Sequence, residues 1–62
     1  MTLEEAQGVA AIVAEADGGC SSCVGELVEL LNAAFPAFLW AMRNKNDEGE
    51  WVGPHVLVVP RP

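Results

Sequence analysis

The chain has 62 residues, which suit a single domain over residues 1–62 and leave no room for a second. Nine acidic residues face three basic ones, and the net charge of −6 argues against direct binding of nucleic acid or of an anionic membrane. No apolar run reaches the roughly 18 residues of a membrane span, and the acidic N-terminus is unlike a basic signal peptide. We therefore expect a soluble, cytoplasmic protein with reduced thiols.

The first predicted element is a helix over about residues 2–16. Thr2 and Glu5 have the spacing of a capping box, in which each side chain bonds the backbone of the other. A strand over Val9–Glu15 is the rival interpretation, because Val and Ile favour sheets. Apolar residues recur at helical spacing at Leu3, Ala6, Val9, Ala10, Val13 and Ala16.

A second helix is predicted over about residues 21–35. Ser21 or Ser22 is expected to cap its start, since serine accepts hydrogen bonds from the free N–H groups of a first turn. Pro36 ends it, because the residue before a proline is pushed away from helical dihedral angles. The polar face is expected at Glu26, Glu29 and Asn32.

Two strands follow, at about residues 37–43 and 50–59. Side chains alternate in character along the first strand, and the polar stretch 44–49 with its glycine is typical of a hairpin loop. Gly53–Pro54 is expected to break or bulge the second strand, because proline cannot donate to a ladder. The sequence thus predicts an α+β fold, with two helices packed on a small antiparallel hairpin.

The pair Cys20 and Cys23 lies at the predicted start of the second helix. A helix N-terminus lowers the pKa of the first thiol, Cys20, and this spacing lets the pair form a strained, reducible disulfide. In this respect the chain resembles the thioredoxin-like and selenoprotein W-like families, which carry such a pair between a strand and a helix. The resemblance implies dithiol redox chemistry, with Pro54 similar to the proline that those folds place opposite the cysteines. The alternative is that both thiols pack in the core as small apolar groups.

A zinc site is a further alternative. Cys20, Cys23 and His55 supply three ligands, whereas a closed structural site needs four. We therefore predict neither a metal nor a cofactor.

The acidic residues fall on the helix faces and near the hairpin loop. A surface of this sign suits a basic partner surface, because complementary potentials speed encounter and select partners. The alternative is that the surplus acid only keeps the protein soluble, and that Trp51 belongs to the core. The candidate partner-binding residues are Glu15, Asp17, Glu26, Glu29, Asp47, Glu48, Glu50 and Trp51.

In size, in charge and in its lack of a catalytic set, the chain resembles the small acidic proteins of phages, including anti-CRISPR inhibitors. That resemblance implies a nucleic-acid mimic that docks on a basic, nucleic-acid-binding surface in the host cytoplasm. This non-enzymatic inhibitor, a monomer or a homodimer, is the leading hypothesis from the sequence. A small dithiol redox protein that uses Cys20 and Cys23 is the alternative. A third hypothesis is a structural or assembly component that functions as a homodimer through its open sheet edge or an uncovered sheet face.

Overall fold

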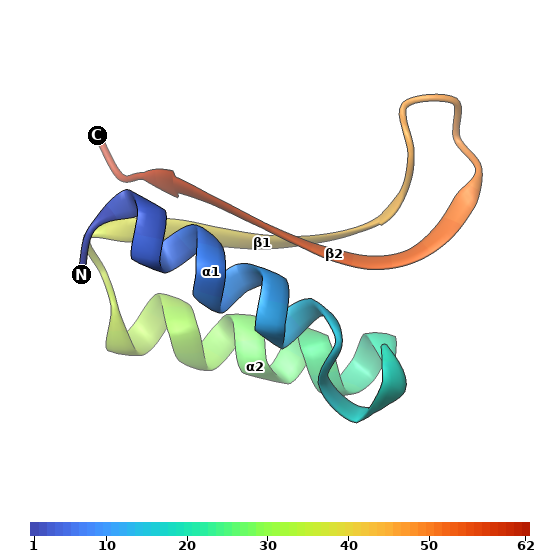
Figure 1. The fold of residues 1–62 in the computed structure, drawn as a ribbon, viewed down its shortest axis with the longest axis horizontal. Coiled ribbons are helices and arrows are strands. Elements are labelled where there is room, and N and C mark those ends of the chain that lie inside the picture. The colour runs from blue at the N-terminus through green and yellow to red at the C-terminus, as the bar shows by residue number, and fades with distance from the viewer.

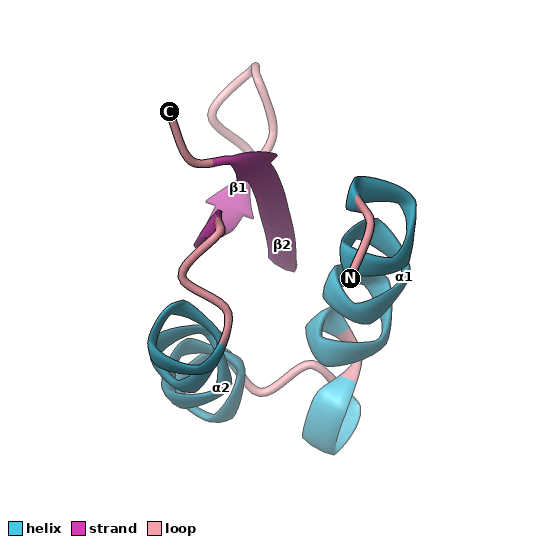
Figure 2. Cartoon of the chain, turned by 90° about the vertical axis from the view of Figure 1, so that its left-hand side faces the viewer, coloured by secondary structure: helices cyan, strands magenta, loops and turns pink.

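The computed structural model describes residues 1–62, and its elements run helix, helix, strand, strand. The two strands form an antiparallel hairpin, and both helices lie on the same side of it (Figures 1 and 2). The predicted α+β class, with two helices packed on a small antiparallel sheet, is therefore confirmed. No helix is both long enough and apolar enough to cross a membrane.

Helix α1 spans Leu3–Ala14 and begins with the predicted capping box. The Thr2 hydroxyl accepts a hydrogen bond from the Glu5 N–H at 3.1 Å, and the Glu5 carboxylate accepts one from the Thr2 N–H at 2.8 Å. Two of the N–H groups that a helix leaves unpaired at its start are thereby satisfied. Residues 9–14 belong to this helix, so the rival strand at Val9–Glu15 is wrong. The cap and the alanines outweigh the β-branched residues there.

The chain then reverses through a short 3-10 turn, η1 (Ala16–Gly18), so α1 ends two residues before the predicted boundary at residue 16. Asp17, Gly18 and Gly19 have positive φ angles of 52°, 71° and 82°. Glycine adopts this left-handed conformation without a steric cost, and aspartate is one of the few other residues that tolerate it. The turn sends α2 back antiparallel to α1 (Figure 1).

Helix α2 spans Ser21–Ala34 and ends just before Pro36, as expected. Its N-cap is Cys20, and the prediction that one of the two following serines caps the helix is wrong. Cys20 is the first residue after the left-handed turn and has extended dihedral angles, φ −66° and ψ 116°. This conformation is the one that an N-cap needs, so both serines fall inside the first helical turn.

Strands β1 (Phe38–Lys45) and β2 (Trp51–Pro60) begin and end within two residues of the predicted 37–43 and 50–59. Their register places Trp40 opposite Val58, and the pairing is irregular between Arg43 and Lys45. The extra residues on the β2 side of this irregularity include the predicted bulge at Gly53–Pro54. The loop end of the hairpin curves away from the helices (Figure 1).

The core lies between the helices and the inner face of the hairpin. Helix α1 packs mainly on β2 and α2 mainly on β1. Asn32 is half-buried, which corrects its predicted place on the polar face of α2. Its side-chain amide donates to the Trp40 carbonyl at 2.8 Å and accepts from the Trp40 N–H at 2.9 Å, which joins α2 to β1. The buried residues are Ala6, Ala10, Val24, Val28, Phe38, Trp40 and Val58.

Candidate functional site: a thiol pair at the start of helix α2

The two cysteines meet at the N-terminus of α2. The Cys23 S–H donates to the Cys20 Sγ across 2.9 Å, and the Cys23 backbone N–H donates to the same sulfur at 3.4 Å. Both thiols are free, Cys20 being exposed and Cys23 half-buried. A disulfide bond has an S–S length of about 2.03–2.05 Å, so the two sulfurs need only a small side-chain movement to bond when an oxidant removes two electrons and two protons. The alternative in which both thiols pack in the core is wrong, because neither residue is buried.

The contacts around the pair give the two thiols different pKa values. Hydrogen bonds from the Cys23 thiol and the Cys23 backbone N–H lower the pKa of Cys20 from its ordinary value of 9.0. The same thiol–thiol hydrogen bond, followed by the Asp17 side chain, raises the pKa of Cys23 to about 12. Cys20 is therefore the thiol that ionises first, and Cys23 is its hydrogen-bond donor.

Asp17 is brought to the pair by the left-handed turn. Its carboxylate favours the protonated form of Cys23, and its negative charge also opposes ionisation of Cys20. Sequence reasoning placed Asp17 among the partner-binding residues and missed this proximity to the thiols. The available signal was the Asp-Gly-Gly order just before Cys20, because these residue types tolerate the positive φ angles of a tight reversal.

The hairpin supports the start of α2. Ser21 donates through its hydroxyl to the Asn44 side chain of β1 at 3.1 Å. On the β2 side, the Pro54 ring lies 3.9 Å from the position that a Cβ on Gly19 would occupy. All peptide bonds are trans, including the one before Pro54. The pair follows helix α1 and the turn η1, and no strand precedes it.

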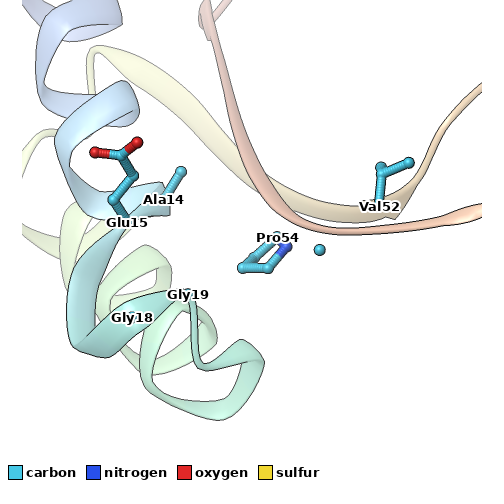
Figure 3. Close-up of a pocket in the computed structure, with 7 residues that line it drawn as sticks. Ala14, Glu15, Gly18, Gly19, Val52 and Pro54 are labelled. Atoms are coloured by element: carbon cyan, nitrogen blue, oxygen red, sulfur yellow. The ribbon is translucent and has the colours of Figure 1, made fainter.

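An open groove lies between the turn that precedes Cys20 and the start of β2. Its volume is about 490 Å³, and Gly18 and Gly19 line it opposite Val52 and Pro54 (Figure 3). Glu15 also lines it, and no basic residue does.

The predicted partner-binding residues are all exposed, including Trp51 with 66% of its surface accessible. They occupy three separate parts of the fold. Glu15 and Asp17 flank the start of η1, whereas Glu26 and Glu29 lie on α2. The remaining four residues, Asp47, Glu48, Glu50 and Trp51, lie at or beside the hairpin loop.

His55 lies on β2 and lines a small depression with Arg43 and Lys45. No group of three or more His, Cys, Asp or Glu side chains is arranged to hold a metal ion. The three ligands considered for zinc are therefore not gathered in one place.

Comparisons with known proteins find no match of any kind. No protein-family model matches this chain, no curated protein matches it, and no solved structure matches it.

Proposed function

We propose that the protein is a small dithiol oxidoreductase that exchanges electrons with disulfides through Cys20 and Cys23. The observation that carries the proposal is the 2.9 Å hydrogen bond from the Cys23 thiol to the exposed Cys20 sulfur at a helix N-cap. The thiolate is the reactive form of cysteine, and this contact favours it at Cys20.

In the first step, the Cys20 thiolate attacks one sulfur of a substrate disulfide. A bond forms between Cys20 and that sulfur, the substrate S–S bond breaks, and the other sulfur leaves as a thiolate that takes up a proton. Cys20 is suited to this step because it is exposed and its pKa is lowered.

In the second step, Cys23 loses its proton to solvent and its sulfur attacks the Cys20 sulfur. The mixed disulfide breaks and the second substrate sulfur leaves, so two electrons and two protons have passed from the protein to the substrate. The raised pKa keeps Cys23 protonated until Cys20 is engaged. A thiol reductant such as glutathione returns the Cys20–Cys23 disulfide to the dithiol.

The direct test is a redox titration. The protein is equilibrated in glutathione buffers of graded redox potential, and thiol exchange is stopped with acid. Mass spectrometry then measures the fraction of the protein that has lost two hydrogens. We expect a reversible Cys20–Cys23 disulfide with a midpoint between about −270 and −120 mV, the range of dithiol oxidoreductases. A pair that stays reduced at every potential, or that forms only mixed disulfides with glutathione, contradicts the proposal.

The acidic binding protein is a second candidate, and we keep it because of one observation. All nine acidic side chains are exposed, and Asp47, paired with Arg43 at 2.8 Å, is the only one in an ion pair. Such a surface is available to a basic partner and suits the anti-CRISPR-type mimic predicted from the sequence.

Its test uses purified CRISPR effector complexes as the probe, with DNA binding as the readout. We expect inhibition that falls steeply with salt and with charge reversal at Glu26 and Glu29, because screening and reversal both remove the attraction. A matched reversal at Asp47 and Glu48 shows which of the two clusters carries the binding. Lack of inhibition at low salt rejects this candidate and leaves the dithiol proposal untouched.

A further inference from the structure

The hairpin has one face that the helices leave uncovered (Figure 2). Its inner face carries the buried residues Phe38, Trp40 and Val58, so the residues between them point to the opposite side. On that outer face the register pairs Leu39 with Val59, Ala41 with Leu57, and Arg43 with His55. All six side chains are exposed.

The centre of this outer face is apolar. Leu39, Leu57 and Val59 keep 44%, 50% and 52% of their surface accessible. A contiguous apolar patch on a small protein marks an interaction surface. Chains of this length also bury too little surface to be stable by a wide margin, and many of them associate with a second copy.

The charge pattern favours a second copy as the occupant. Residues 37–46 and 51–62 contain none of the nine acidic residues, so the strands form an acid-free surface on a protein of net charge −6. Two copies can bring these surfaces together while their acidic helices stay on the outside, far apart. A basic partner, in contrast, would be attracted to the rest of the molecule and not to this face.

The two ends of the face carry net charges of opposite sign, because at the loop end the three carboxylates Asp47, Glu48 and Glu50 outnumber the basic Arg43 and Lys45. At one end the hairpin loop, which curves toward the outer side (Figure 1), carries Glu48 and Glu50, and neither is in an ion pair. At the other end Arg61 is fixed beside the start of β1. Its backbone N–H donates to the Ala37 carbonyl and its Nε to the Pro36 carbonyl, both at 3.0 Å.

We propose that two copies pack outer face to outer face about a twofold axis. The axis lies in the plane of the interface and is perpendicular to the strands, so the two hairpins point in opposite directions. The Glu48 end of each copy therefore lies over the Arg61 end of the other. Such an isologous contact makes each attraction twice. The apolar side chains at the centre are buried between the two sheets, with a helix layer on either side. Cys20 lies in the helix layer, so this inference is independent of the dithiol proposal.

Sedimentation equilibrium from micromolar to millimolar concentration tests the dimer. We expect the wild-type mass to rise from 6.6 kDa to twice that value with concentration. Leu57→Asp should remain a monomer, because it places a charge in the apolar centre. Leu30→Asp is the matched control, since Leu30 is an equally large and more exposed residue on α2, and it should dimerise like the wild type. Val59→Lys repeats the test if Leu57→Asp does not fold.

The charged ends supply an orientation test. Arg61→Glu should weaken the dimer by roughly tenfold, because two symmetry-related attractions become repulsions. Adding Glu48→Lys to the same chain should restore most of the loss. A wild-type protein that stays monomeric at millimolar concentration overturns the proposal. So does a dimer that Leu57→Asp and Val59→Lys leave intact, or one in which the charge swap restores nothing.

Discussion

The two helices begin in the same way, with different chemistry. At α1 the Thr2 hydroxyl accepts from the N–H three residues on, and the Glu5 side chain bonds back. At α2 the Cys20 sulfur accepts from the N–H three residues on, and the Cys23 thiol bonds back to that sulfur. Both N-cap side chains accept a hydrogen bond at the same spacing, but only the Thr2–Glu5 contacts are reciprocal, because both Cys23 donors point at the Cys20 sulfur.

The difference lies in the capping atoms. A hydroxyl stays protonated at neutral pH, so Thr2 contributes only to the free energy of unfolding. A thiol ionises, and the N–H and S–H donors that make Cys20 a cap also stabilise its thiolate. In the dithiol proposal, a capping position becomes a reactive site because a thiol stands where α1 has a hydroxyl.

The largest effect is expected from Cys20→Ser. This change turns the second cap into a hydroxyl like the first, so disulfide exchange should fall to the uncatalysed background. The free energy of unfolding should change by less than about 1 kcal/mol, because serine is a good N-cap. Reduction of an aromatic disulfide reagent and urea unfolding measure the two quantities. Substantial activity that survives in this variant would place the reactive thiol elsewhere.

Cys23→Ser should stop the reaction halfway. Cys20 can still attack, although with a less favoured thiolate, but no second sulfur is present to resolve the product. The expected result is a stable mixed disulfide, seen by intact mass as the protein plus one half of the disulfide reagent. Cys20→Ser is the matched control and should gain little mass. If the Cys23→Ser variant releases its adduct as fast as the wild type, Cys23 is not the resolving thiol.

Asp17→Asn tests the electrostatic part of the site. Removing the carboxylate should lower the pKa of both thiols and reduce the preference for cationic over anionic disulfides. We expect the ratio of reaction rates, cystamine to oxidised glutathione, to fall by roughly two- to tenfold, because the lost carboxylate no longer attracts the cationic reagent or repels the anionic one. Glu29→Gln, which removes one charge from α2, is the control. An equal fall in both variants would mean that only net charge matters.

Thr2→Ala should have the smallest effect on disulfide exchange, because it changes the cap of α1 and leaves the cap of α2 intact. Exchange rates should match the wild type, while the free energy of unfolding falls by about 1 kcal/mol. The pKa of Glu5 is lowered by its hydrogen bonds to Thr2. The contribution of the Glu5 carboxylate is therefore complete above the unfolded value of 4.5 and is lost as the pH falls through the lower folded value. Its main hydrogen bond comes from the Thr2 backbone N–H, which Thr2→Ala keeps, so unfolding measured at pH 7 and at pH 3 should show both proteins losing stability at pH 3.

Much of the fold can be predicted from the sequence because it depends on local interactions. The Thr2–Glu5 spacing, the stop at Pro36 and the alternation from Phe38 to Met42 each depend on neighbours within a few residues. The left-handed turn was harder to predict, since three successive positive φ angles depend on how α1 and α2 pack. The position of that turn makes Cys20 the N-cap of α2.

Contacts between distant segments were not predictable from patterns. Asn32 looks like an exposed polar residue on α2, yet it pairs with both backbone groups of Trp40. The proximity of Asp17 to Cys23 also follows from the turn geometry, which periodicity does not report. Residue type and spacing predicted the cysteine pair and a lowered pKa at its first thiol, whereas the contacts that raise the pKa of Cys23 depend on the fold.

The most direct test of the account is the rate at which each cysteine is alkylated, in the native and in the unfolded protein, followed by mass. Cys20 should be alkylated faster in the native protein than in the unfolded protein at neutral pH. It should keep reacting as the pH falls below 9.0, its ordinary pKa. Cys23 should react slowly until the pH approaches about 12. Equal rates for the two thiols, or a native Cys20 slower than the unfolded one, would contradict it.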